Sequence, residues 1–447
     1  MSKFVADLHL HSSYSRATSP SLSFDTLSEW AKLKGIQLLA SADFTHPVWW
    51  RETREKLKES KNAGFYKYGD VNFVLGTEIS CIYSQGGRGR RIHCLLFFPD
   101  KANIEEFNQK LGQLGNLSAD GRPILGISAR QLLSIALSVN EKAIFIPAHA
   151  WTPWFSLYGS NSGFDSLEEC FGDLSKYIYA IETGLSSDPA MNWRIKELDG
   201  RSIVSFSDAH SCPKMGREAT IFETEFSYEG LLPALKSADG LPALPKIAFT
   251  VEFFPEEGKY HFTGHRNCNV RHSPDQTAKL GIICPQCKKK LTIGVMHRVE
   301  ELADKNRREG FDPKNRPPFK RLVPLLEIIA ESLGAPVKSN KVAEEYKKLV
   351  DHFGSEMAVL LKAQAPDLEK AVSIQRIVEG IKKVREGDIV VEPGFDGVYG
   401  VVKIWPTRNA SRSVAGGPGR KGTKISERQK LPTESEKQAE GQIGLFE

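Results

Sequence analysis

The chain has 447 residues, with 60 Lys and Arg against 55 Asp and Glu, a formal net charge of +5, and 40% hydrophobic residues. At roughly 100–200 residues per domain, this length predicts two or three folded domains. No apolar run approaches the roughly 18 residues of a membrane span, and the first residues lack a signal-peptide pattern. We expect a cytoplasmic monomer without a membrane partner, whose mild positive charge permits nucleic acid as a partner without requiring it.

The first 244 residues alternate short apolar runs with amphipathic stretches. Residues 24–35 predict a helix that has Asp25 as its cap and ends at Gly35. Alternation of strands and helices is typical of a parallel sheet or barrel, so we expect an α/β fold. The strand-like runs cover residues 4–10, 35–43, 71–79, 91–98, 142–150, 177–182 and 201–210.

The rest of the chain changes in character twice. Residues 245–298 hold short polar and cysteine-containing segments, and residues 299–405 predict helices followed by a strand pair within 387–405. From residue 406 to 447 the chain is rich in Gly, Ser and charged residues, which predicts a disordered tail up to its last few residues. We therefore expect a barrel or sheet over 1–244, a small module over 245–298 and a helical region over 299–405.

Acidic residues and histidines gather at the ends of the predicted strands. Asp7, His9 and His11 alternate in the first strand, so we expect them to converge on one face. Carboxyl ends of strands form the active-site face of a (β/α) barrel, and imidazole with carboxylate ligands suits zinc, manganese, iron or magnesium. A set of this size indicates two or three ions, with Glu78 as a bridge. The candidate metal ligands are His9, His11, Asp43, His46, Glu78, His93, His149, Asp208 and His210.

Five segments, DLHLH, GTEIS, IHCLL, PAHA and SDAH, occur in an order that resembles the PHP (polymerase and histidinol phosphatase) family. That family has a distorted (β/α)7 barrel with a trinuclear metal site and hydrolyses phosphoesters. The resemblance implies one metal on His9, His11, Glu78 and Asp208, a second on Glu78, His93 and His149, and a third on His210. The segment SADFTHP has Phe44 where the family has a histidine, so Asp43 or His46 is the expected substitute.

Hydrolysis of a phosphoester by such a site needs no covalent enzyme intermediate. Metal ions neutralise the phosphate oxygens, lower the pKa of a bound water and stabilise the leaving alkoxide. We expect Glu78 and Asp208 to be the catalytic carboxylates. Arg16, in SSYSRATSP, is expected to bind the phosphate, with an ordinary surface arginine as the alternative.

Three of the seven cysteines lie close together in the sequence, which favours a metal site in a reducing compartment over a disulfide framework. His265-x2-Cys268 and Cys284-x2-Cys287 are separated by 15 residues, a spacing typical of one structural zinc. His261 and His272 are near enough to replace His265. The surrounding basic residues suit phosphate backbones and are Arg266, Arg271, Lys288, Lys289 and Lys290.

The segments ADFTHPVWW, GKYHFTGHRNC, HRVEELAD and EPGFDGVYG resemble the endonuclease Q family of PHP nucleases, over nearly the full length to about Trp405. The resemblance implies nicking of damaged double- or single-stranded DNA on the 5′ side of uracil, hypoxanthine, xanthine or abasic sites, with 3′-hydroxyl and 5′-phosphate products. It also implies a nucleoid-associated protein with a PHP barrel over 1–244, a zinc module over 245–298 and a DNA-binding helical region over 299–405.

A nuclease that inspects a base must flip it out of the duplex into a pocket. The loop AWTPWFSLYGSNSGF after His149 offers aromatic rings and polar groups for this purpose, although the rings alternatively close the barrel mouth. The candidate pocket residues are Trp151, Tyr158, Ser160, Asn161 and Glu182.

Two other functions stay open. A small-molecule phosphatase, like histidinol phosphatase, explains the barrel but not the zinc module or the other residues beyond it. A non-catalytic damage-binding or polymerase-accessory module explains those parts, but it has no need of so many histidines on one rim.

The last residues, GQIGLFE, are more apolar than the tail before them. Gln442, Leu445 and Phe446 resemble the motif by which bacterial repair proteins bind the DNA sliding clamp. Such side chains gain nothing in a disordered segment unless they dock elsewhere. We therefore expect the tail to bind the clamp.

Overall fold

The computed structural model describes residues 1–238 and 245–406, and residues 1–404 form one compact unit. Gln442, Leu445 and Phe446 lie outside the described residues. Within the described ranges, no helix is both long and apolar enough to cross a membrane.

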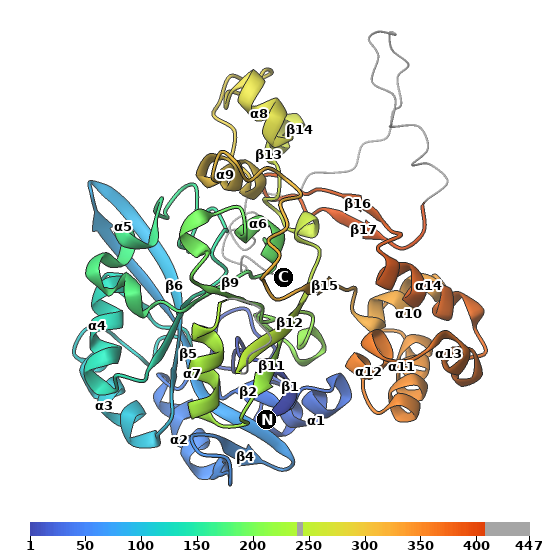
Figure 1. The fold of residues 1–447 in the computed structure, drawn as a ribbon, viewed down its shortest axis with the longest axis horizontal. Helices are drawn as coiled ribbons and strands as arrows, with labels where there is room; N and C mark the ends of the chain where they lie inside the picture. The colour runs from blue at the N-terminus through green and yellow to red at the C-terminus, as the bar shows by residue number, and fades with distance from the viewer. Residues whose placement is uncertain (239–244, 407–447) are drawn as a thin grey trace, which may run out of the picture. The chain divides into compact units, whose positions relative to one another are not determined.

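A mixed sheet runs through the centre of this unit (Figure 1) and contains eleven of the described strands. Its main path is β15-β12-β11-β1-β2-β5-β4-β3, with β6 and β7 on β5 and β8 on β6. The strands of this sheet are β1 (Ser2–Asp7), β2 (Leu38–Ala40), β3 (Lys58–Glu59), β4 (Tyr66–Tyr68), β5 (Val71–Gln85), β6 (Arg88–Phe98), β7 (Ile124–Leu125), β8 (Ile144–Pro147), β11 (Ala219–Thr224), β12 (Lys246–Glu252) and β15 (Phe319–Arg321). A separate parallel pair consists of β9 (Ala180–Glu182) and β10 (Ser202–Val204).

The sheet is mixed, whereas the alternating pattern predicted parallel strands. β1, β2 and β5 are parallel, but β5 and β6 form a long antiparallel hairpin. Gly86 and Gly87 join them with φ of 61° and 73°, the left-handed conformations that a two-residue hairpin turn requires. Because Ser80 pairs with His93, the histidine lies on the same face of the sheet as Glu78, two residues from Ser80.

Helices cover this sheet. They are α1 (Phe24–Lys34), α2 (Pro47–Lys56), α3 (Lys101–Gly112), α4 (Ala129–Val139), α5 (Leu167–Phe171), α6 (Pro189–Asn192) and α7 (Tyr228–Lys236). The predicted end of α1 at Gly35 is confirmed, with φ of 82°, but its cap is Ser23 instead of Asp25. The Ser23 hydroxyl accepts a hydrogen bond from the Thr26 N–H, and Asp25 accepts one from Tyr68.

The module predicted over 245–298 begins later than its expected boundary. β12 pairs with β11 and β15, so residues 246–252 belong to the main sheet. The part that projects at the top of Figure 1 contains the hairpin of β13 (Thr263–His265) and β14 (Val270–His272), followed by α8 (Pro274–Leu280). α9 (Val295–Leu302) packs against α6 and returns the chain to the sheet.

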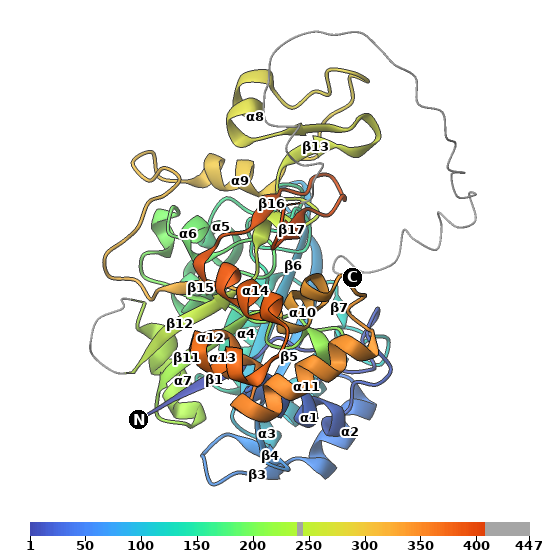
Figure 2. The same ribbon diagram turned by 90° about the vertical axis from the view of Figure 1, so that its right-hand side faces the viewer.

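The predicted helical region and strand pair are both present (Figure 2). α10 packs against α11 and α14, and β16 pairs with β17 in an antiparallel hairpin. The elements are α10 (Leu325–Leu333), α11 (Asn340–Phe353), α12 (Glu356–Leu361), α13 (Ala365–Ala371), α14 (Gln375–Glu386), β16 (Val390–Glu392) and β17 (Val401–Lys403).

A buried ion pair connects the helical region to α1. Lys34 Nζ lies 2.7 Å from Glu356 Oε2, and the two side chains are 1% and 4% exposed. Glu356 also accepts hydrogen bonds from the Leu325 N–H and the Tyr346 hydroxyl. The carboxylate therefore holds three separate segments at one point.

Replacing Lys34 by Met should lower the free energy of unfolding by about 3–5 kcal/mol, because it leaves the Glu356 charge buried without its partner. Urea denaturation measures this change. The matched control is Lys32→Met on the same helix. Lys32 forms an exposed ion pair with Asp70 at 2.9 Å, and its loss should lower the free energy of unfolding by less than about 1 kcal/mol. Equal losses in both variants would contradict a structural role for the buried pair.

Candidate metal centres

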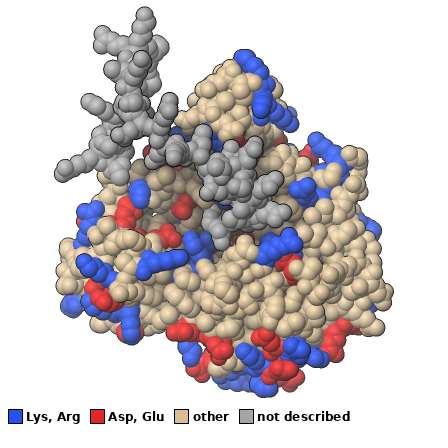
Figure 3. Space-filling model, turned by 180° about the vertical axis from the view of Figure 1, so that it is seen from behind, with Lys and Arg blue, Asp and Glu red and all other residues tan. Residues whose placement is uncertain are grey.

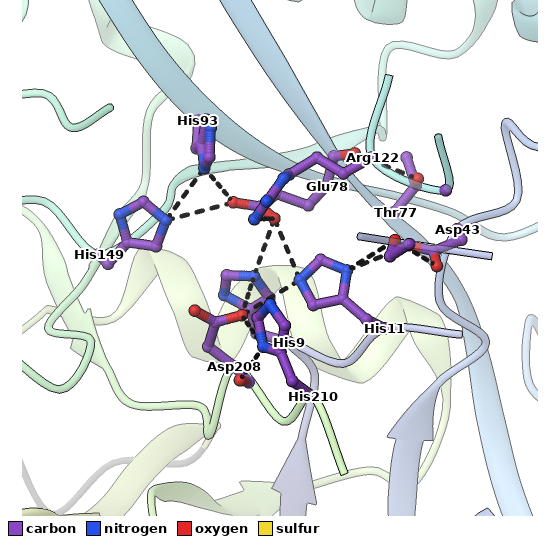
Figure 4. Close-up of polar contacts among 12 residues, drawn as sticks. His9, His11, Asp43, Thr77, Glu78, His93, Arg122, His149, Asp208 and His210 are labelled. Carbon is purple, nitrogen blue, oxygen red and sulfur yellow. Dashed lines mark hydrogen bonds and ion pairs between the residues drawn. The ribbon is translucent and has the colours of Figure 1, made fainter. Parts of the chain in front are cut away.

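Two groups of potential ligands share the carboxylate of Glu78 (Figure 4). One group contains His9, His11, Glu78 and Asp208, and the other contains Glu78, His93 and His149. Within each group the ligand atoms lie within 4.8 Å of one another, and all of these residues are buried. Glu78 Oε2 lies 3.2 Å from His11 Nε2, whereas Oε1 lies 2.7 Å from His93 Nδ1 and 3.2 Å from His149 Nε2.

The backbone brings these residues together from the segments after β1, β8 and β10 and from the middles of β5 and β6, which carry Glu78 and His93. Leu10 bridges to Ala209, so the segment after β1 runs beside the segment after β10 and places His11 Nε2 3.1 Å from Asp208 Oδ1. Asp208 and His149 have positive φ values of 47° and 29°. Such conformations are costly for residues other than glycine and cluster at functional sites.

Asp7 does not join His9 and His11 as expected. Its two carboxylate oxygens accept hydrogen bonds from the Ser207 and Gly216 N–H groups, each at 2.9 Å. Asp7 is in neither ligand group of the described residues. It holds the loop that carries Asp208, because Ser207 is the residue before it.

Two other carboxylates orient the histidines. Glu182, predicted for a base pocket, lies 2.9 Å from His9 Nδ1 and accepts the His149 N–H at 2.7 Å. Asp43, predicted as a ligand, lies 3.3 Å from His11 Nδ1, and its other oxygen accepts from Ser12 and Ser15. Both histidines therefore keep Nε2 directed at the ligand group, an arrangement that fixes tautomer and ring orientation in metal sites.

Of the residues expected at a third metal, Asp43 and His210 lie next to His11, whereas His46 serves as a helix cap. His46 caps α2 by accepting the Trp49 N–H and stacks on Tyr14, with ring centroids 4.5 Å apart. His210 lies beside the ring of His11 at 4.7 Å. Phe44 is fully buried in the core. Among the described residues, Asp43, His46 and His210 belong to no group of three ligands.

Arg122 is the residue of this site that the sequence patterns missed. Its Nη1 donates to Glu78 Oε2 at 3.0 Å, whereas the predicted Arg16 pairs with Asp120 and is 76% exposed. Arg122 follows Gly121, where a Cβ would fall 2.3 Å from an Asp43 oxygen. No local sequence pattern marks Arg122, because the close approach of Gly121 to Asp43 joins two distant segments.

Burial and mutual charge decide the ionisation of the cluster. Burial alone would raise the pKa of Glu78, but Arg122 and nearby histidines outweigh it and hold this pKa well below its usual range. Burial opposes the charge of Arg122, yet the carboxylates of Glu78 and Asp208 raise its pKa. Burial lowers the pKa of His93 to about 4, whereas nearby carboxylates outweigh burial at His9 and His11 and raise their pKa values.

The donor set fits divalent metal ions. His9 Nε2 is a buried nitrogen without a hydrogen-bond partner in the described structure, and it lies 3.4 Å from both Glu78 Oε2 and Asp208 Oδ1. Imidazole nitrogens and carboxylate oxygens crowded at this separation, with Glu78 shared between groups, are the ligands of zinc and related ions.

The aromatic loop does not form the predicted base pocket. Trp151 and Tyr158 are fully buried in the core, with their rings 4.8 Å apart, and donate to Asn192 and Glu197. Ser160 donates to the Ile293 carbonyl, and Asn161 is exposed. Trp151 and Tyr158 therefore pack in the core, and their polar atoms already have partners.

His265, Cys268, Cys284 and Cys287 form the other ligand group, within 4.8 Å of one another. Tetrahedral zinc with bonds of about 2.3 Å separates two sulfurs by about 3.8 Å, so this spacing fits. Burial raises the pKa of Cys284, but the Cys287 and Gln286 N–H groups outweigh it and lower the pKa to about 6. The two alternative histidines, His261 and His272, are buried outside the group.

Lys and Arg side chains line an edge of this projecting part (Figure 3). All five basic residues named from the sequence are exposed. A surface of this charge suits phosphate groups.

An α/β fold with a buried, shared histidine–carboxylate cluster and a Cys3His group has the donor sets of a protein that binds divalent metal ions. The structure is similar to that of the lesion-specific endonuclease PfuEndoQ of Pyrococcus furiosus, with a TM-score of 0.79. The sequences are 31% identical, and the match covers 93% of this chain and 100% of that one. Endonuclease Q bound to a 27-mer duplex with an abasic lesion matches with a TM-score of 0.78 and 31% identity, over 92% and 100% of the two chains. The chain belongs to the endonuclease Q family.

Sequence comparison agrees. The Bacillus subtilis protein YqxK is 31% identical over 423 residues, 90% of this chain and all of that protein. MJ0043 of Methanocaldococcus jannaschii is 32% identical over 268 residues, 58% of this chain but 32% of that larger protein. The family model of the MJ0043 C-terminal domain matches residues 324–388. The predicted α/β fold with a C-terminal helical region is thus confirmed.

Replacing Cys284 by Ser should remove one equivalent of zinc from the purified protein, because three remaining ligands no longer close a tetrahedral site. Inductively coupled plasma spectrometry measures the metal content. Cys212→Ser is the matched control, since Cys212 is a buried thiol outside the ligand groups of the described residues. Loss of zinc from both variants, or from neither, would contradict the assignment.

Proposed function

We propose that the chain is a metal-dependent DNA repair endonuclease that nicks 5′ to deaminated bases and abasic sites. The observation that carries this proposal is the near full-length similarity to PfuEndoQ, whose name describes it as lesion-specific. The buried cluster around Glu78 supports the hydrolytic chemistry. The substrate class is damaged DNA containing uracil, hypoxanthine, xanthine or an abasic site, and the products are 3′-hydroxyl and 5′-phosphate ends.

The sheet up to β11 and its helices constitute the proposed PHP barrel, with two or three divalent metals at the shared cluster. Divalent cations there would supply charge for the phosphate oxygens and activation of the attacking water. The chain itself holds His9 and His11 in position through Glu182 and Asp43. Asp208 Oδ1, close to both histidines, completes the first group.

Arg122 takes the role of phosphate binding in this proposal, in place of Arg16. Its guanidinium donates a hydrogen bond to Glu78, and its side chain is 22% exposed. The remaining N–H groups can therefore meet a phosphate oxygen that approaches the cluster from solvent. A planar guanidinium suits this task because it can bind two oxygens at once.

The basic face of the projecting module and the helical region are the proposed DNA-binding surfaces. Sliding-clamp binding by Gln442, Leu445 and Phe446 stays a prediction from sequence. A tether to the clamp would raise the local concentration of the nuclease at DNA.

An end-labelled duplex with a single deoxyuridine, deoxyinosine or abasic site, incubated with the full chain and Mg²⁺ or Mn²⁺, tests the proposal. A nick on the 5′ side of the lesion supports it. Release of phosphate from histidinol phosphate without nicking would identify a small-molecule phosphatase instead. Binding without cleavage would identify an accessory module.

Asp208→Ala should lower the initial rate of nicking by at least about 1,000-fold, because it removes a ligand whose oxygen lies close to both His9 and His11. The initial rate of nicking measures activity, and the urea midpoint measures folding. Asp173→Ala, at an exposed carboxylate that pairs with Arg130, serves as the control and should keep full activity. Full activity in Asp208→Ala would overturn the site.

Arg122→Ala should slow nicking by about 10–100-fold, and Arg122→Lys by less, because lysine keeps the charge but not the two-pronged geometry. Arg16→Ala is the matched control and should change the rate by less than about threefold, since an exposed salt bridge contributes little. Metal content is measured in parallel to separate phosphate binding from metal loading. A larger loss in Arg16→Ala would restore the original assignment.

A further inference from the structure

His93 is held differently from the histidines of the other ligand group. Its Nδ1 faces the cluster, 2.7 Å from Glu78 Oε1 and 3.2 Å from His149 Nε2 (Figure 4). His9 and His11 present Nε2 instead, and a carboxylate lies at the Nδ1 of each. Among the described residues, no side chain hydrogen-bonds to Nε2 of His93. Packing must therefore fix the orientation of this ring.

Phe155, in the loop after His149, supplies this packing. The centroids of the Phe155 and His93 rings lie 4.9 Å apart, with 47° between the ring planes. The Phe155 carbonyl also accepts a hydrogen bond from the His93 N–H at 3.1 Å. The ring of His149 packs on His93 as well, at 5.1 Å, but His149 is itself a candidate ligand. Phe155 is thus the support of His93 that lies outside the ligand groups of the described residues.

Backbone hydrogen bonds fix Phe155 against β6. β8 pairs with β6 over Cys94–Phe97, and the loop continues this edge, because the Arg91 N–H donates to the Ser162 carbonyl at 3.3 Å. The Phe155 N–H in turn donates to Ser162 Oγ at 3.2 Å. The Arg91 guanidinium lies 5.4 Å from the centroid of the Phe155 ring. A shift of Phe155 would therefore break contacts with the strand that carries His93.

The backbone conformation of Phe155 is unusual for a bulky side chain. Its φ is 64°, in the left-handed region, where the Cβ of an L-residue is crowded by the following carbonyl. Glycine would adopt this conformation freely. Such strain persists where the surroundings enforce it, and it clusters at functional sites. A phenylalanine at a position suited to glycine indicates that its ring has a function there.

We propose that Phe155 is a positioning residue, which holds the His93 imidazole with Nδ1 directed at Glu78 so that this ligand group is assembled before a metal ion binds. The inference rests on the metal site of the proposed function and assigns Phe155 no contact with DNA or with the reacting atoms. Histidines that bind metal usually rely on a carboxylate, carbonyl or water at the second ring nitrogen for their orientation. At His93 an aromatic ring takes that place.

Phe155→Gly removes the ring and suits the left-handed backbone, so the loop should keep its shape. It should weaken one step of Mn²⁺ binding by about 10–100-fold, the loss typical when a residue that orients a metal ligand is removed. Phe155→Tyr keeps an aromatic ring and should bind Mn²⁺ within about threefold of the unaltered chain.

Electron paramagnetic resonance of free Mn²⁺, during titration of the full chain, measures the number and the affinity of the bound ions. One equivalent of Zn²⁺ is supplied first, because thiolate ligands take zinc in preference to manganese. With the Cys3His group filled, Mn²⁺ reports on the histidine–carboxylate cluster. The urea midpoint of each variant shows that it folds.

A double-mutant cycle separates positioning of His93 from a general structural effect. In a His93→Ala background, Phe155→Gly should change the Mn²⁺ affinity by less than about twofold, because the ligand that it positions is already absent. Trp154→Ala is the matched control in the same loop. Its ring packs on Tyr260, with centroids 5.6 Å apart, so its removal should leave Mn²⁺ binding unchanged.

Unchanged Mn²⁺ affinity in Phe155→Gly would overturn the proposal. An equal loss in the two backgrounds, or a loss of the same size in Trp154→Ala, would also overturn it, because either result describes a structural role. If the unaltered chain binds no Mn²⁺, or binds it as tightly after His93→Ala, this ligand group is not a metal site and the positioning role falls with it. Failure of the nuclease function gives a different result, in which Mn²⁺ binds as expected but no lesion is nicked.

Discussion

The burial of the Glu78 carboxylate is the constraint on which the rest of the site depends. A buried charge without partners is too costly to retain, so the surrounding strands must supply compensation. Histidines come from the segments after β1 and β8 and from β6, and Arg122 comes from the loop before β7. Each oxygen of Glu78 faces a different ligand group, which makes this one residue the junction of both.

A second layer of carboxylates explains why the strand ends carry more acidic residues than the cluster uses. Asp7, Asp43 and Glu182 all lie behind the ligands and accept hydrogen bonds from backbone or side-chain groups near them. Their effect is to hold loops and imidazole rings in one orientation. Metal sites commonly have such residues, which hydrogen-bond to the ligands and fix their orientation.

The parts beyond the sheet are attached at a few polar points. Asp396, between β16 and β17, accepts hydrogen bonds from Thr292 Oγ1 and the Arg266 N–H, which ties the hairpin to the projecting part that contains β13 and β14. Lys34 and Glu356 attach the helical region to α1.

The α/β class, most of the strands and the residue types of the candidate ligand groups could be predicted from the sequence. His9, His11, Glu78, His93, His149 and Asp208 could be named because each lies in a short motif on or just after a predicted strand, which is a local pattern. The Cys3His spacing is local as well, and so is the end of α1 at Gly35, which needs only one residue of positive φ.

Only the tertiary structure decided which polar side chains face the cluster and which serve as supports. Asp43 and Glu182 carry the same chemistry as the candidate ligands, and their histidine partners come from distant segments that no local pattern encodes. Trp151 and Tyr158 resembled binding residues because aromatic rings suit both stacking and cores, and burial alone separates these roles. Arg122 could not be predicted, because its neighbour Gly121 lies against Asp43, a residue 78 positions away in the chain.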